Sequence, residues 1–209
     1  MESTQQNDVP KLVSTGGPLF RKPDLSHEEF DTAWHRHGQL VTPWCVKSGV
    51  WEYIQIHMPP PPPPPPASPL SMSPSSSLAT TTDEAGSRAN DTVEARAELI
   101  LRHADGVAIM RRYQVPTDAG TRYFRTVVLP DERRFLHDES GAGAVLGDPP
   151  VYDVPALEVD TWREMALRLG GVEYVKIRDG KDVVGNAFWG EWERVEKERE
   201  KEEEEKGGG

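Results

Sequence analysis

An unbroken proline run from Pro59 to Pro66 divides this chain. Proline lacks a backbone N–H and fixes φ, so the run fits neither a helix interior nor a central strand, and we expect a stiff polyproline helix. A Ser/Thr/Pro-rich tract follows to about Asp91 and lacks the apolar residues that a core needs. A folded domain must therefore be assembled from the sequence on both sides of a low-complexity insert at 59–91.

Both ends of the chain are also poor in apolar residues. Residues 1–16 are mostly polar, and we expect them to be disordered. Residues 191–209 are a charge run that ends in three glycines, which predicts a frayed, solvated helix as a tail. Residues 17–190 without the insert have the size of one small domain.

Charge and cysteine content exclude several classes of protein. The formal charge is −11 and no basic stripe is present, which argues against nucleic-acid binding. Cys45 is the single cysteine, so no intrachain disulfide can form, and we expect a reducing, cytoplasmic compartment. No apolar run has membrane-spanning length and the N-terminus lacks a signal pattern, so we expect no membrane association.

The segment from Ser26 to about Trp44 predicts an amphipathic helix. Ser26 and Glu29 have the spacing of a capping box. At about 100° per residue, one sector of the helix carries His37 inward and leaves His35 towards solvent. The aromatic and aliphatic residues of that sector are Phe30, Trp34, Val41 and Trp44.

The role of His37 has two interpretations. A histidine among apolar residues is often a core residue satisfied by one backbone carbonyl. In a dry pocket, however, the apolar walls disfavour the charged form and lower the histidine pKa, as an acid/base catalyst requires. Gly38, Pro43 and Gly49 predict that the helix kinks or frays after His37.

The next segment, 50–58, alternates with strand periodicity. Tyr53, Gln55 and His57 share one face, and three hydrogen-bonding groups on one face suit a ligand cavity. A half-wet edge strand explains the same pattern.

Beyond the insert, helices alternate with strands. We expect helices at 93–102, 117–128 and 161–169, a strand at 105–113 and a hairpin over 172–184. This order predicts an α+β fold with helices layered on a small antiparallel sheet.

Five short motifs in sequence resemble an EthD-type domain. They are Arg-Lys-Pro-Asp-Leu-Ser-x-Glu-Glu-Phe at 21–30, His37-Gly38-x-Leu40 before Pro43-Trp44, Tyr53-x-Gln55-x-His57, Asp105-Gly106-Val107-Ala108 and Val-Leu-Pro-Asp-Glu-x-x-Phe-Leu at 128–136. The closest similarity is to fungal decarboxylases of the atrochrysone-carboxylate type, which act on aromatic polyketide carboxylic acids. The segment 12–18 departs from the pattern, because two glycines and a proline stand where the first strand is expected.

The resemblance implies a ferredoxin-like half barrel, β-α-β-β-α-β, that pairs its sheet faces in a homodimeric α+β barrel. It also implies a pocket for a small hydrophobic aromatic substrate, with no cofactor and no metal. We take His37 as the acid/base group, His57 and Tyr53 as groups that hold a substrate oxygen, and Asp105 as a residue that orients a histidine. Phe30, Trp34, Val41, Trp44 and Gln55 complete the expected substrate-binding set.

Three functions are compatible with these residues. The first is decarboxylation of an aromatic or β-keto acid, which needs a proton at the carbon that loses CO₂. The second is an oxidoreductase of the EthD type that acts on a small hydrophobic substrate. The third is a binding or accessory protein without catalysis. The alternative to the site roles given above is that Tyr53 is a core residue and Asp105 only a turn residue.

Overall fold

The computed structural model describes residues 11–60, 92–113, 121–137, 155–185 and 188–207. The expected disorder of residues 1–10, and nearly all of the expected insert, lie outside these ranges.

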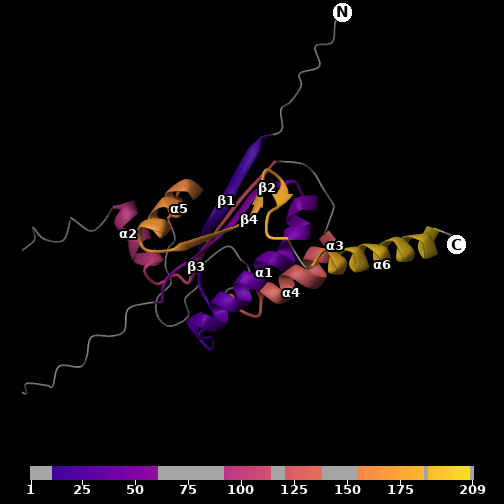
Figure 1. Ribbon diagram of the computed structural model, residues 1–209, viewed down its shortest axis with the longest axis horizontal. Helices are drawn as coiled ribbons and strands as arrows, with labels where there is room; N and C mark the ends of the chain where they lie inside the picture. Colours follow the sequence, from indigo (N-terminus) through magenta and orange to yellow (C-terminus); the bar gives the residue numbers. More distant parts are fainter. Residues whose placement is uncertain (1–10, 61–91, 114–120, 138–154, 186–187, 208–209) are drawn as a thin grey trace, which may run out of the picture.

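A five-stranded antiparallel sheet forms the centre of the fold (Figure 1). The strand order is β1–β3–β2–β4–β5, in which β1 is Leu12–Leu19, β3 Gly106–Tyr113, β2 Val50–His57, β4 Val172–Arg178 and β5 Lys181–Asp182. β1 and β2 lie on either side of β3 and are connected by helix α1 (His27–Lys47). This arrangement confirms the predicted α+β, ferredoxin-like class, and β4 joins the sheet beside β2.

Helices cover both faces at the centre of the sheet. α2 (Val93–Leu101) and α5 (Val159–Arg168) bury the β2 and β3 side chains of one face, with Trp162 at the contact. α1 covers the other face together with the helical turns at 121–132 and the start of α6 (Trp189–Gly207). The expected homodimer through sheet faces stays a prediction, and a partner on the first face would meet α2 and α5.

The first strand forms although its sequence looked unfavourable. β1 pairs with β3 from Leu12↔Tyr113 to Leu19↔Gly106, so the folded part begins before residue 17. Pro18 is tolerated because β1 is an edge strand that pairs on one side only. A Cβ at Gly16 would collide with the backbone oxygen of Ala108, so a glycine is required there.

Helix α1 begins with the predicted capping box. The Glu29 backbone N–H donates to Ser26 Oγ at 3.2 Å, and the Ser26 backbone N–H donates to Glu29 Oε2 at 2.8 Å. The predicted kink after His37 is wrong, since α1 runs unbroken through Pro43 to Lys47. Burial of Val41 and Cys45 holds these last turns against the core.

A π-helix lies opposite α1. The helical segment consists of α3 (Thr121–Tyr123), η1 (Phe124–Val128) and α4 (Leu129–Glu132). The Leu129 N–H bonds to the Phe124 carbonyl, the wider spacing of a π-turn. Pro130 explains the change of period, because its ring lacks an N–H and would clash with a carbonyl four residues earlier.

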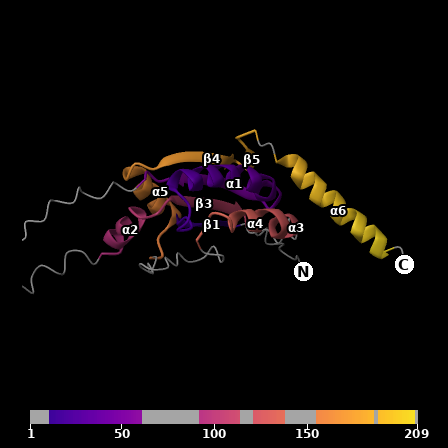
Figure 2. The ribbon, with the colours of Figure 1, turned by 90° about the horizontal axis from the view of Figure 1, so that it is seen from below.

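The C-terminal charge run packs at its start. Trp192 and Val195 of α6 are buried against α1 and Tyr123, so the expectation of a fully solvated tail from residue 191 is wrong for the first turns. The remainder of α6 projects away from the domain (Figure 2). Among the described helices, none combines the length and apolar character needed to cross a membrane.

Candidate functional site

Polar side chains gather between α1 and the β2–β4 half of the sheet. α1 provides Asp31 and His35, β2 provides Gln55 and His57, and β4 provides Tyr174 and Lys176. We call these six residues the buried polar cluster because Gln55, His57 and Lys176 at its centre are buried, whereas Asp31 and Tyr174 lie at its exposed rim. Two predicted site residues, Gln55 and His57, belong to it, and Trp34 packs directly against it.

His57 is held as a neutral base. Its Nδ1 lies 2.5 Å from Asp31 Oδ1, and its ring stacks on Trp34 with centroids 4.5 Å apart. Burial lowers the pKa of His57, although the hydrogen bond to Asp31 opposes this shift. A carboxylate only accepts, so the ring donates its Nδ1–H and leaves Nε2 as a lone pair. His57 is 5% exposed, and its Nε2 has no hydrogen-bond partner among the described residues.

Lys176 is a fully buried amine. Its Nζ lies 3.2 Å from His35 Nδ1 and 5.6 Å from the centre of the Tyr174 ring. Burial lowers the pKa of Lys176 to about 8. Burial and the neighbouring Lys176 charge lower the pKa of His35, so neutral His35 accepts the hydrogen bond. No acidic group pairs with Lys176 in the part of the chain that the structure describes.

Gly38 allows α1 to approach the cluster. A Cβ at this position would lie 2.6 Å from Gln55 Oε1 and 2.7 Å from Lys176 Cε. Gln55 Nε2 donates to the Trp34 carbonyl at 2.8 Å and to Tyr53 Oη at 3.1 Å, whereas Oε1 is buried without a partner among the described residues. The cluster therefore retains two unsatisfied buried acceptors, Gln55 Oε1 and His57 Nε2.

His37 lies on the other flank of α1. It is 6% exposed, and its Nδ1 is 3.0 Å from Oδ2 of Asp131, whose Oδ1 lies 3.0 Å from Arg36 Nη1. Burial raises the pKa of Asp131, but the hydrogen bonds and charges of His37 and Arg36 outweigh it and hold this pKa below its ordinary value. The inward position of His37 is as predicted, yet α1 separates it from His57.

Asp105 contacts His27, a histidine that does not belong to the predicted site. Its Oδ1 lies 3.2 Å from His27 Nδ1, and its carboxylate also accepts from the Arg21 side chain and, at 2.8 Å, from the Arg21 backbone N–H. These contacts tie the start of α1 to the end of β1. We assign Asp105 a structural role.

The remaining predicted binding residues are core residues. Phe30 packs on Phe135 with ring centroids 5.8 Å apart, Val41 lies in the core beneath α1, and Trp44 contacts the Phe124 ring. Tyr53 is 5% exposed, and burial raises its pKa, so its phenol is a neutral partner of Gln55.

Sequence reasoning missed Asp31, His35, Tyr174 and Lys176. Two spacings point to them. Asp31 and His35 are four residues apart and share a helix face, and Tyr174 and Lys176 are two apart in a strand.

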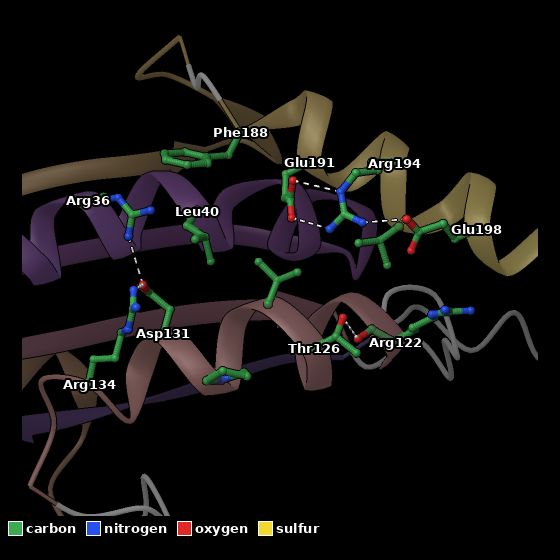
Figure 3. Close-up of a pocket in the computed structure, with 13 residues that line it drawn as sticks. Arg36, Leu40, Arg122, Thr126, Asp131, Arg134, Phe188, Glu191, Arg194 and Glu198 are labelled. Atoms are coloured by element: carbon green, nitrogen blue, oxygen red, sulfur yellow. Dashed lines mark hydrogen bonds and ion pairs between the residues drawn. The ribbon is translucent and has the colours of Figure 1, made fainter.

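A separate cavity of about 690 Å³ opens between α1, the η1–α4 segment and α6 (Figure 3). Arg36 and Asp131 line it, so the His37–Asp131 pair lies at its wall. No predicted substrate-binding residue lines this cavity. The described residues contain no group of three or more His, Cys, Asp or Glu side chains placed to hold a metal ion.

Comparison with known proteins adds one match. A family model described as EthD domain matches residues 22–139, more than half of the chain. No curated protein matches the chain, and no solved structure does.

Proposed function

Because the chain belongs to the EthD domain family of small α+β barrel proteins, we propose that it is a small-molecule enzyme whose buried polar cluster decarboxylates an aromatic, polyketide-type carboxylic acid. The observation that carries this proposal is the state of His57. Its Nδ1 is held by Asp31, its Nε2 lone pair is buried without a partner in the described residues, and the Lys176 charge acts on the same ring. Titratable groups with shifted pKa values that gather in this way are typical of active sites.

The cluster has the two proton carriers that the reaction needs. His57 Nε2 accepts the proton of a phenol on the substrate, which increases electron density at the carbon that bears the carboxylate. The Lys176 ammonium delivers a proton to that carbon. The bond between this ring carbon and the carboxylate then breaks, and CO₂ leaves. The electron pair of that bond restores the aromatic ring. His57 returns its proton to the phenolate, and water reprotonates Lys176.

The protonation states suit this division of roles. With a pKa of about 8, Lys176 is mostly protonated at neutral pH but gives up its proton readily. The lowered pKa of His57 keeps it unprotonated and able to accept. Since no acidic side chain in the described ranges pairs with the Lys176 ammonium, this group also attracts the substrate carboxylate.

The cluster reaches the surface at β4. Tyr174 is 39% exposed and Val172, which pairs with His57 across the strands, is 54% exposed. His35 is half-buried beside them. A planar aromatic acid approaching from this side meets the Tyr174 ring first.

CO₂ release and product mass from an anthracenone-type carboxylic acid test the proposal, without added metal or cofactor. We expect His57→Gln to lower kcat by roughly 10²–10⁴-fold, the usual contribution of one acid/base group. His103→Gln is the matched control, because His103 is exposed and remote from the cluster. Circular dichroism reports whether each variant is folded.

Two results contradict the assignment. Full turnover by His57→Gln with loss in His37→Gln would move the acid/base role to His37, as the sequence alone suggested. A folded wild-type protein that releases no CO₂ but turns over with an added oxidant would support the oxidoreductase alternative instead.

A further inference from the structure

We propose that the cavity between α1, η1–α4 and α6 binds an amphipathic organic monocarboxylate, separately from the buried polar cluster. Arg36 and Arg134 would hold the carboxylate, and Leu40, Val127 and Val195 would contact the apolar body. This site does not depend on the proposed decarboxylation.

The cavity has a charged end and an apolar middle. In Figure 3, Arg36, Asp131 and Arg134 lie together at one end, and Leu40 points into the space between α1 and the opposite helix. Val127 comes from the π-helix and Val195 from α6, which packs on the domain through Trp192. Three elements distant in sequence thus form one lined space.

Charges at the far end of the cavity are already paired. Arg194 contacts Glu191 and Glu198, each at 2.6 Å, and Arg122 contacts Glu202 at 2.9 Å. Three glutamates face two arginines there, so this end has a surplus of one negative charge and does not attract a carboxylate.

The charges of Arg36 and Arg134 are only partly neutralised by acidic side chains among the described residues. Both depend on Asp131, at 3.0 Å for Arg36 and 3.8 Å for Arg134, and Asp131 is also hydrogen-bonded to His37. No other acidic group lies within ion-pair distance of either arginine among the described residues. One carboxylate between two guanidinium groups leaves a surplus of one positive charge, which matches a monoanion.

The arginines are also accessible. The Arg134 side chain is 76% exposed and that of Arg36 is 50% exposed. The Arg36 guanidinium lies over the Phe188 ring at 5.3 Å, which orients it at the cavity edge. A planar guanidinium binds a carboxylate through paired hydrogen bonds.

The overall charge of the protein makes anion binding informative. A chain with a formal charge of −11 repels anions in general. Specific affinity for a carboxylate would therefore report a local site.

Isothermal titration of the full chain with octanoate, decanoate and dodecanoate, below micellar concentrations, tests the proposal. We expect affinity to rise by up to about fourfold for each methylene that is buried. Arg134→Gln should weaken dodecanoate binding about tenfold, since a hydrogen bond to a charged group is lost. Arg133→Gln removes the same charge from an exposed neighbour that does not line the cavity, and it should bind as the wild type does.

Three results would overturn the proposal. These are no binding of dodecanoate to the folded wild type, equal losses in Arg134→Gln and Arg133→Gln, or binding of 1-octanol as tight as that of octanoate. No binding of dodecanoate would mean that the cavity is a surface groove without a ligand. Equal losses in the two variants would mean that only the general charge of the surface matters. Equally tight binding of 1-octanol would mean an apolar site that does not recognise the anion. None of them bears on CO₂ release.

Discussion

Replacing Lys176 by methionine tests whether a buried amine destabilises the fold. Lys176 is fully buried, and its pKa is lowered from 10.5 to about 8 because burial disfavours the ammonium form. Methionine has a similar length and no charge. We therefore expect Lys176→Met to be more stable than the wild type at neutral pH.

The magnitude follows from the two pKa values. They differ by about 2.5, and a difference of one corresponds to about 1.4 kcal/mol, so the charged amine costs about 3 kcal/mol in the folded state. Below pH 8 the amine is protonated in both the folded and unfolded states, and this cost is present in full. Between pH 8 and 10.5 the unfolded chain binds more protons, so the stability of the wild type rises with pH.

Urea denaturation of both proteins from pH 7 to 10.5 measures the effect. The stability advantage of Lys176→Met should be largest at pH 7 and decline by about 3 kcal/mol as pH rises through this window. Tyrosine and cysteine titrations occur in both proteins and largely cancel in the difference. Lys181→Met, at an exposed lysine of β5, should show no such trend. An advantage of Lys176→Met that is constant with pH would refute the reasoning.

Two further changes test the packing around α1. Gly38→Ala should lower the free energy of unfolding by about 1–3 kcal/mol, because the new Cβ would meet Gln55 and Lys176. The control is Gly190→Ala in α6, where the new Cβ meets no other atom within 4 Å, and it should not destabilise the protein in the same urea titration. Asp131→Asn should lower the free energy of unfolding by about 2 kcal/mol at neutral pH. Since the pKa of Asp131 is lowered in the folded protein, this loss should shrink below about pH 4. A loss that does not change with pH contradicts the ion-pair assignment.

The sequence was sufficient to predict the elements where local signals agree. The Ser26–Glu29 capping box begins α1 as expected, and Val50 to His57 alternates as a strand should. The β4–β5 hairpin turns at Asp179, which has a positive φ, and at Gly180. In each case the determining interactions span only a few residues.

Elements that depend on distant contacts were not predictable in this way. The composition of α6 indicates a solvated charge run, but two side chains of one face, Trp192 and Val195, meet a surface formed by α1 and Tyr123. The continuity of α1 through Pro43 has a similar origin. Thr42, Pro43 and Cys45 are all buried, and this burial against the rest of the domain outweighs the local cost of the proline.

The candidate site illustrates the same limit for function. Hydrophobic periodicity identifies the most apolar stripe of α1, which includes Phe30, Trp34 and His37, and these side chains are indeed buried. The aromatic side chains of this stripe form core contacts with Phe135 and with each other. The α1 side chains of the site that we propose lie on the adjacent stripe.

Asp31, His35 and Gly38 form that adjacent stripe, and their spacing places them over the β2–β4 half of the sheet. The Asp31 carboxylate orients His57, and neutral His35 accepts a hydrogen bond from Lys176. Gly38 has no side chain, which leaves space for Gln55. At the border of the apolar stripe a polar group can be partly buried, as is His35, whose pKa is lowered by burial and by the Lys176 charge. The active site that we propose therefore rests on a strand histidine, His57, paired with such a border residue, Asp31, and not on a histidine at the centre of the helix face.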